Sequence, residues 1–370
     1  MKNVLFITYG FSLGGAETFL INLLNGLDKS KIKPIVVSLG EGNELISRLN
    51  TDIAFYELKR RWKYDLAPAF KIARLIKQFE IEKVFAVSLF CYFFVYISRY
   101  LVKIPIKIFI SLHSTKPRSI KDFVQNWIFF RLLGDEQLIA ICEYQVTYLS
   151  KIYQLKKEKF KIIYNGVDPA HWTLMKSDFN REEFRKELDI QNDDLVIIQV
   201  AGFRKEKSHI DSIRALKLLH EKYNLKAYLI FNGDGDKKII QMLKNMVLEL
   251  EIKKYVKFCG KQMDVRPYYW VSDLFTLSSI SIETFSIAAL ESMSCGLPAV
   301  LTDLGGAKEM ILEGISGFVI PPGRYDKLAE GWFKILHKKT DFDPNRIREI
   351  IEKKFSLIDC VQGYEKLLFD

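Results

Sequence analysis

Two glutamates with seven residues between them, Glu283 and Glu291, carry the clearest chemical signal in this chain. An apolar strand is predicted at residues 273–277, so Glu283 lies in a loop beyond its carboxyl end, where parallel α/β sheets bind ligands. Glu291 lies about two turns into the following helix. The first amides of that helix suit an anion such as a diphosphate, and they belong to Phe285, Ser286 and Ile287. Glu283, the first helix amides and Glu291 could therefore contact a sugar, a diphosphate and a ribose, respectively.

A cationic turn follows another predicted strand, residues 195–201, and contains Arg204, Lys205 and Lys207. Cations at this edge of a sheet would stabilise the charge that develops on a departing nucleoside diphosphate. A basic turn that only faces solvent is the alternative. A second turn, which contains Gly233, follows the predicted strand at residues 227–231. We interpret it as a strand–helix turn beside a nucleotide, because turns are generally rich in Asp and Gly.

The first half of the chain has two further candidate positions. Adjacent Gly14 and Gly15 join the first predicted strand to the first helix and allow close backbone approach. Their loop lacks the Gly-x-Gly-x-x-Gly fingerprint of dinucleotide binding. His113 directly follows a predicted strand at residues 107–112, and its imidazole can hydrogen-bond a sugar hydroxyl in either tautomer. A plain turn and a loop histidine without a task are the alternatives.

The length of 370 residues is too large for one ordinary core and predicts two domains. Predicted strands and helices alternate in both halves, which is typical of parallel sheets covered by helices. We expect two doubly wound α/β domains, residues 1–168 and 169–350, that face each other across a cleft. Residues 345–368 are predicted to form two helices with a break near Ser356. Other strands are predicted at residues 3–8, 33–39, 53–58, 83–89, 137–141, 160–164, 255–259, 299–302 and 317–320.

The net charge of +10 belongs to the first half. Residues 1–168 hold 25 Lys and Arg against 15 Asp and Glu, whereas residues 169–370 hold 30 of each. This asymmetry indicates an anionic partner such as a membrane surface, a phosphate-bearing acceptor or nucleic acid; solvated lysines are the alternative. Two aromatic and basic segments, residues 59–64 and 122–133, favour peripheral membrane contact. Core packing explains most of the aromatic residues in the second segment.

Other function classes have little support. The five cysteines show no Cys-x-x-Cys spacing and the five histidines no His-x-x-x-His spacing, so we expect reduced cysteines, no metal and no cofactor. The most apolar window, residues 84–102, contains Arg99 and divides into a strand and a helix, so a membrane span is not expected. No nucleic-acid recognition motif occurs, and we expect no nucleic-acid partner.

These features, in this order, resemble the retaining glycosyltransferases of the GT-B fold, in the large family four that includes many sugar transferases of bacterial surface polysaccharides. The resemblance covers nearly the whole chain. Its most specific part is Glu283 and Glu291 with the Cys-Gly-Leu-Pro continuation. Weaker matches are the Gly-Gly-Ala-Glu loop, His113, residues 165–168, the Lys207 and Gly233 turns, and residues 314–323.

The resemblance implies roles for these residues. The implied catalytic residues are Glu283, His113 and Lys207, with Glu283 beside the donor sugar. The implied donor-binding residues are Gly15, Arg204, Lys207, Gly233, Phe285, Ser286, Ile287 and Glu291, with Glu291 on the ribose. Residues 351–370 are expected to form a helix that packs back on the first domain. The chain departs from the family at Gly202, where arginine is frequent, and at Ser286, where glycine is frequent.

The resulting hypothesis is a hexosyltransferase-type enzyme that moves a sugar from a nucleotide diphosphate sugar, preferably a UDP-sugar, to a hydroxyl of a glycan or lipid-linked acceptor. Transfer would retain the anomeric configuration and serve cell-surface polysaccharide synthesis. The expected location is the cytoplasm, with membrane contact at the inner face of the cell membrane through the basic first domain. The rivals are a non-catalytic homologue that acts as a partner subunit, and a sugar-nucleotide epimerase or phosphorylase on the same fold.

Overall fold

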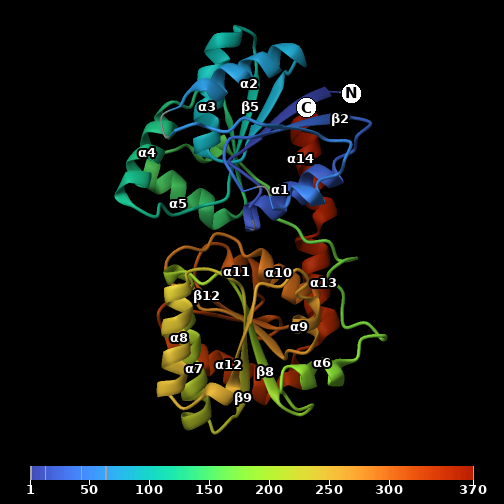
Figure 1. The fold of residues 1–370 in the computed structure, drawn as a ribbon, viewed down its shortest axis with the longest axis vertical. Coiled ribbons are helices and arrows are strands. Elements are labelled where there is room, and N and C mark those ends of the chain that lie inside the picture. The colour runs from blue at the N-terminus through green and yellow to red at the C-terminus, as the bar shows by residue number, and fades with distance from the viewer. Residues whose placement is uncertain (1, 13, 43, 63–64, 370) are drawn as a thin grey trace. The chain divides into compact units, whose positions relative to one another are not determined.

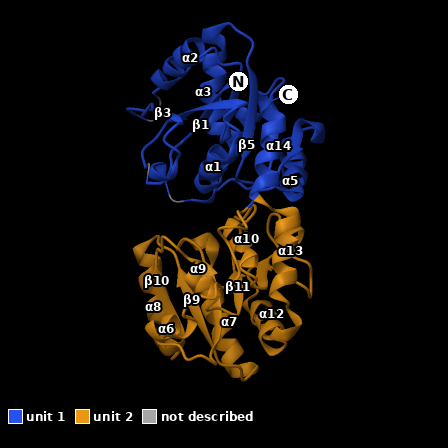
Figure 2. Ribbon diagram, turned by 90° about the vertical axis from the view of Figure 1, so that its right-hand side faces the viewer, with its two compact units in different colours: residues 1–166, 357–370 blue, residues 167–356 orange. Residues whose placement is uncertain are grey.

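The computed structural model describes residues 2–12, 14–42, 44–62 and 65–369. It forms two compact units, unit 1 with Met1–Gly166 and Leu357–Asp370, and unit 2 with Val167–Ser356 (Figure 2). Each unit has one parallel sheet flanked by helices (Figure 1). The predicted α/β architecture with two parallel sheets is therefore confirmed. Leu13 of the glycine loop, and Lys63 and Tyr64 of the segment at residues 59–64, lie outside the described residues.

Within the described residues, seven strands form the sheet of unit 1 in the order β3-β2-β1-β4-β5-β6-β7. Neighbouring strands are parallel, and their apolar residues form a core because both faces of such a sheet are covered. The strands are β1 Lys2–Thr8, β2 Ile32–Ser38, β3 Ala54–Glu57, β4 Lys83–Ala86, β5 Lys107–Leu112, β6 Gln137–Ala140 and β7 Phe160–Ile162. The α-helices are α1 Gly15–Gly26, α2 Ala67–Gln78, α3 Leu89–Val102, α4 Ile120–Arg131, α5 Glu143–Tyr153 and α14 Leu357–Phe369.

The described part of unit 2 has a six-stranded parallel sheet in the order β10-β9-β8-β11-β12-β13. Its strands are β8 Leu195–Val200, β9 Ala227–Asn232, β10 Val256–Gly260, β11 Leu274–Leu277, β12 Ala299–Thr302 and β13 Gly317–Ile320. Its α-helices are α6 Arg181–Glu187, α7 His209–Lys222, α8 Lys237–Glu249, α9 Arg266–Trp270, α10 Ile287–Ser294, α11 Ala307–Met310, α12 Tyr325–His337 and α13 Pro344–Lys354. Chain order reverses between β8 and β11, and ligands of open α/β sheets bind at such switch points.

Two predictions of element boundaries have different outcomes. The helix break near Ser356 is confirmed, because α13 ends at Lys354 and α14 begins at Leu357. The prediction of a strand through residue 89 is wrong at its end, since β4 stops at Ala86. Ser88 caps α3 instead, and its hydroxyl accepts a hydrogen bond from the Cys91 amide at 3.1 Å. A serine cap of this kind can end an apolar run that composition alone would continue.

A buried arginine anchors the start of β11 in unit 2. The side chain of Arg185, on α6, has no exposed surface and lies 3.6 Å from the Asp273 carboxylate. Its guanidinium also donates hydrogen bonds of 2.7–3.2 Å to the backbone carbonyls of Gln191, Asn192, Asp194 and Val271. The arginine thus ties α6 and the turn before β8 to the residues that lead into β11.

We expect Arg185→Met to lower the free energy of unfolding by about 3–5 kcal/mol, because it leaves several carbonyls buried without their donor. Asp273 keeps its contacts with Lys339 and with the Val196 amide. Urea unfolding followed by circular dichroism measures this loss. Arg181→Met is the matched control, one turn earlier on α6, where the guanidinium makes a long hydrogen bond of 3.5 Å to the Asn192 carbonyl. Its loss should stay within about 0.5 kcal/mol. Equal losses in both variants would contradict the anchoring role.

Candidate active site

The loops that follow β8 and β11 meet at the carboxyl edge of the sheet in unit 2. Lys207 lies in the short 3-10 helix at Lys205–Lys207, and Glu283 lies in the loop after β11. The Lys207 Nζ and the Glu283 Oε2 are 2.6 Å apart. Their side chains are 14% and 18% exposed, so both charged groups are mostly covered yet reachable from solvent. The structure thus brings together Glu283 and Lys207, two of the residues that the sequence analysis named as candidates.

Serine hydroxyls and one backbone bond hold these two loops together. Ser278 donates to the carbonyls of Lys207 and Ser208 at 3.0 and 2.9 Å. Ser279 donates to the Glu283 Oε2 at 3.3 Å, and the amide of Ile280 donates to the carbonyl of Glu206 at 2.9 Å. The ion pair is therefore supported by neighbours that limit its motion. Sequence reasoning missed both serines, because hydroxyls in a Ser-rich loop carry no distinctive spacing.

The N-terminal end of α10 lies directly after Glu283. Ser286 caps this helix, and its hydroxyl accepts a hydrogen bond from the Ala289 amide at 3.2 Å. The first amides of a helix have no acceptor inside the helix and carry the positive end of its dipole. The Thr284 carbonyl is bonded by the Gly306 amide at 2.7 Å, which holds the loop before the cap. Helix α10 therefore begins at Ile287, directly after its Ser286 cap, and anion binding by the amides of residues 285–287 stays a prediction.

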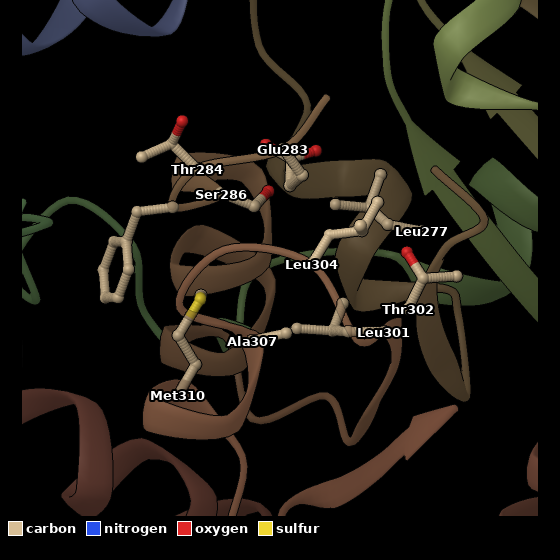
Figure 3. A pocket seen from close by; sticks show the side chains of 10 residues that line it. Leu277, Glu283, Thr284, Ser286, Leu301, Thr302, Leu304, Ala307 and Met310 are labelled. Atoms are coloured by element: carbon tan, nitrogen blue, oxygen red, sulfur yellow. The ribbon is translucent and has the colours of Figure 1, made fainter. Parts of the chain in front are cut away.

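A narrow recess lies beneath this loop. It is lined by Leu277, Glu283, Thr284, Phe285, Ser286, Leu301, Thr302, Leu304, Ala307 and Met310. Figure 3 shows Glu283, Thr284 and Ser286 along one side and Leu301, Ala307 and Met310 along the other. Its volume is about 10 Å³, which is about the space that one water molecule needs. The recess is therefore too small for a ligand larger than a water molecule.

Glu291 faces a different environment on the same helix. Its carboxylate lies 3.4 Å from the hydroxyl of Tyr269, a fully buried residue of α9. Burial raises the pKa of the Glu291 carboxyl to about 8, although the Tyr269 hydrogen bond acts in the opposite direction. Before a ligand binds, this group is therefore mostly protonated at neutral pH and can both donate and accept a hydrogen bond. Tyr269 is a second residue that the sequence did not reveal, because it is one of several aromatic residues in a short apolar run.

Arg204 and Gly233 lie on the same sheet edge but differ from Lys207 in what they contact. The Arg204 side chain is 51% exposed and pairs with Glu206, with 3.8 Å between Nε and Oε1. Gly233 has a φ of 155°, and a Cβ there would come within 2.1 Å of the Ala201 carbonyl oxygen. Its amide donates to the Gly260 carbonyl at 2.8 Å. Gly233 is therefore required for close packing of the turns after β8 and β9, and Arg204 is free to reorient.

His113 and Gly15 belong to unit 1, at the carboxyl edge of its own sheet. His113 follows β5, and its Nε2 lies 3.0 Å from the Ser111 hydroxyl. Its ring packs on Phe19 of α1, the helix that begins at Gly15, with 4.8 Å between ring centroids. Burial lowers the pKa of the His113 imidazole to about 4, so the ring is neutral at physiological pH. A neutral imidazole suits hydrogen bonding to a hydroxyl group. Among the described residues, no group of three or more His, Cys, Asp or Glu is arranged to hold a metal ion.

The raised pKa of Glu291 predicts a pH effect on stability. Between about pH 4.5 and 8 the folded state keeps a proton that the unfolded state releases, so this group lowers the stability as the pH rises. The slope cannot exceed about 1.4 kcal/mol per pH unit. We expect Glu291→Gln to lose this decline, measured as the melting temperature of the ligand-free protein across that range. Glu221→Gln, at a 62% exposed position on α7, is the control. Equal slopes in wild type and Glu291→Gln would contradict the burial argument.

Comparisons with known proteins identify the relatives of this chain. Residues 13–171 match the family model described as glycosyltransferase family 4, and residues 180–354 match glycosyl transferases group 1. The chain is 27% identical over 318 residues to N-acetyl-alpha-D-glucosaminyl L-malate synthase of Bacillus anthracis, over 83% of this chain and 79% of that protein. It is 24% identical over 265 residues to UDP-Gal:alpha-D-GlcNAc-diphosphoundecaprenol alpha-1,3-galactosyltransferase of Escherichia coli, over 70% of this chain and 67% of that protein.

Solved structures share the fold over essentially the full chain. The Anabaena protein HepE in complex with UDP-glucose has a TM-score of 0.86 and 21% identity, over 100% of this chain and 99% of that chain. A glycosyltransferase from Rickettsia africae has a TM-score of 0.84 and 19% identity, over 99% and 98% of the two chains. Two adjacent glycosyltransferase domains and this fold together lead to one conclusion. The chain is a glycosyltransferase of the GT-B fold, similar to family 4.

Proposed function

We propose that this protein transfers a sugar from a nucleotide diphosphate sugar to an acceptor hydroxyl, with retention of the anomeric configuration. The observation that carries the proposal is the Lys207–Glu283 pair beside the N-terminal end of α10. A cation and the N-terminal end of a helix suit a diphosphate, and a neighbouring carboxylate suits sugar hydroxyls. Few other ligands combine an anion of this kind with adjacent hydroxyl groups.

The donor is most simply a UDP-sugar. The galactosyltransferase relative from Escherichia coli is named for UDP-Gal, and the Anabaena structure contains UDP-glucose. In our proposal Glu291 bonds the ribose hydroxyls, and the amides at residues 285–287 bond the diphosphate. Lys207 moves toward the diphosphate when the donor binds, Arg204 adds a second cation, and the Gly233 turn lies beside the nucleotide. Glu283, released from Lys207, then contacts the hydroxyls of the sugar.

The proposed reaction occurs on one face of the sugar. The bond between the anomeric carbon and the diphosphate oxygen breaks, and the acceptor oxygen bonds to the same carbon from the same side. The proton of the acceptor hydroxyl passes to the departing phosphate oxygen. Lys207 and the α10 amides stabilise the charge that grows on the diphosphate, and this stabilisation is larger in the transition state than in the ground state.

The acceptor is assigned to the first half of the chain. We propose that residues 1–168 bind a glycan or lipid-linked acceptor, that residues 169–350 bind the donor, and that residues 351–370 complete the first domain. The neutral ring of His113 would hydrogen-bond a hydroxyl, with the Gly15 loop beside it. The excess of basic residues in this half supports an acceptor that carries phosphate. Such an acceptor fits hexosyl transfer in cell-surface polysaccharide synthesis, at the cytoplasmic face of the cell membrane.

A thermal-shift screen tests the donor. We expect UDP or a UDP-sugar to raise the melting temperature of the purified protein, because a ligand that binds only the folded state stabilises it. GDP and ADP conjugates should give smaller shifts, and Glu291→Ala should abolish the shift with UDP. A shift with every nucleotide that survives in Glu291→Ala would contradict the ribose assignment. A shift with none would favour a non-catalytic partner subunit.

Replacement of the carboxylate tests catalysis. We expect Glu283→Gln to lower turnover by about 10²–10³-fold, because it removes a charge beside the reacting sugar, with an unchanged circular dichroism spectrum. Release of the nucleotide from the donor found in the screen is the measured quantity. Glu206→Gln is the matched control, since Glu206 lies next to Lys207 in sequence but its side chain pairs with Arg204. Wild-type turnover by Glu283→Gln would overturn the assignment.

A further inference from the structure

One nitrogen of the His113 ring is held by the protein and the other is available to a ligand. Ser111, on β5, is fully buried, and its hydroxyl oxygen lies 3.0 Å from the Nε2 of His113. His113 itself is partly exposed. Its Nδ1 has no hydrogen-bond partner among the residues that the structure describes. A ligand in unit 1 would therefore meet Nδ1, while Ser111 occupies Nε2.

A second hydroxyl, that of Tyr364, is buried next to Ser111. Tyr364 belongs to α14, the helix that lies beside α1 in unit 1 (Figure 1), and it has no exposed surface. Burial raises the pKa of this phenol, and hydrogen bonding to Ser111 acts in the opposite direction. The bond is a weak one in the ligand-free protein, because no described residue lies in normal hydrogen-bond geometry to the Tyr364 oxygen.

Aromatic packing keeps these groups together. Phe19 of α1 packs against both rings, with 4.8 Å between its centroid and that of His113 and 5.4 Å to that of Tyr364. Phe85 of β4 lies edge-on to Tyr364 at 5.5 Å. Both phenylalanines are almost completely buried. Because such a core is close-packed, the phenol and the imidazole cannot turn away from Ser111 without moving their neighbours.

The hydrogen atoms of the three groups can be assigned by counting donors and acceptors. The imidazole is neutral, because burial lowers the pKa of His113 to about 4, and it carries one proton on either Nδ1 or Nε2. With the proton on Nε2, that N–H donates to Ser111, Ser111 donates to Tyr364, and the phenol O–H is buried without a good acceptor. With the proton on Nδ1, Tyr364 donates to Ser111 and Ser111 donates to Nε2. The second arrangement gives both buried hydroxyls an acceptor and is therefore favoured.

We propose that Ser111 and Tyr364 are positioning residues, which hold His113 in the tautomer with its proton on Nδ1 so that the ring donates a hydrogen bond to an oxygen of the bound ligand. A hydroxyl oxygen of a sugar accepts such a bond. The inference rests on the proposed role of His113 and adds the direction of its hydrogen bond. An Nδ1 that already carries a proton cannot take another from the acceptor hydroxyl, which agrees with proton transfer to the departing phosphate oxygen.

Nitrogen NMR of the ligand-free protein tests the tautomer without substrate. The protonated and unprotonated nitrogens of a neutral imidazole have well separated chemical shifts, so full-length protein with isotope-labelled histidine distinguishes them. The signals that disappear in His113→Gln identify this residue. We expect a protonated Nδ1 and an unprotonated Nε2 at neutral pH. A protonated Nε2, or an even mixture of the two tautomers, would overturn the proposal.

Variants of the serine test what selects the tautomer. Ser111→Ala should let the two tautomers mix, because it removes the hydroxyl that donates to Nε2, whereas Ser111→Thr keeps a hydroxyl and should keep the wild-type spectrum. Tyr364→Phe should cause a smaller change in the same direction. The matched control is Ser98→Ala, since Ser98 is also fully buried in unit 1 but its hydroxyl bonds the carbonyls of Ala69 and Phe94. An unchanged tautomer in Ser111→Ala would contradict the assignment.

Turnover separates positioning from packing. We expect Ser111→Ala to lower kcat about fivefold, the effect of one hydrogen bond, and Ser111→Thr to recover most of the loss. Tyr364→Phe should lower kcat by less, and Tyr153→Phe, at another buried tyrosine of unit 1, should leave it unchanged. Wild-type kcat in a Ser111→Ala protein with an altered tautomer would overturn the positioning role. Absence of turnover in the wild type would count against the proposed function, whereas the tautomer is scored independently of it.

Discussion

The side-by-side pairing of β8 and β11 is the constraint on which the site in unit 2 depends. The two strands share a short register, Leu274 opposite Ile197 and Phe275 opposite Ile198. Their loops then leave the same sheet edge at the point where the strand order reverses, so Lys207 and Glu283 meet although 76 positions separate them. A bond of 2.7 Å from the Asp273 amide to the Val196 carbonyl lies at the start of this pairing. Arg185, which binds the Val271 carbonyl and approaches Asp273, therefore supports the site from the opposite end of the strands.

Burial favours the neutral form of two titratable groups, Glu291 in unit 2 and His113 in unit 1. Desolvation raises the pKa of the Glu291 carboxyl and lowers that of the His113 imidazole, and both shifts favour the neutral form. Neutral groups of this kind match the hydroxyls of a ribose or of an acceptor. Opposite charges stay close together at the Lys207–Glu283 pair, beside the positive end of α10. A nucleotide sugar has the same division into neutral hydroxyls and a charged diphosphate, which is why we propose it as the donor.

Unit 1 differs from unit 2 in how its apolar residues are used. Its sheet core is fully covered, as parallel strands require. Yet α4 leaves several large apolar side chains exposed, among them Ile120, Val124 and Ile128.

Much of the fold and part of the site followed from the sequence. Alternation of apolar strands and helices predicted two parallel α/β sheets, because each strand must be buried on both faces and each helix on one. The spacing of Glu283 and Glu291 predicted that a helix N-terminus lies between them, since that relation is local. The expected two helical turns before Glu291 were wrong, because α10 begins at Ile287 and Glu291 lies about one turn into it. Gly233 was recognised as part of a turn, but its close approach to Ala201 was not. The end of β4 was misjudged, because a single serine hydroxyl decided where the next helix begins.

Contacts between distant segments were decided only by the tertiary structure. The ion pair of Lys207 with Glu283, its two supporting serines and the contact of Glu291 with Tyr269 join residues from separate strands and helices. No spacing along the chain encodes them. The pKa of Glu291 depends on burial, which exists only after α9 and α10 have packed. The sequence likewise determined that α4 is rich in apolar residues, but only packing against α3 and α5 decided which of them face the core and which face solvent.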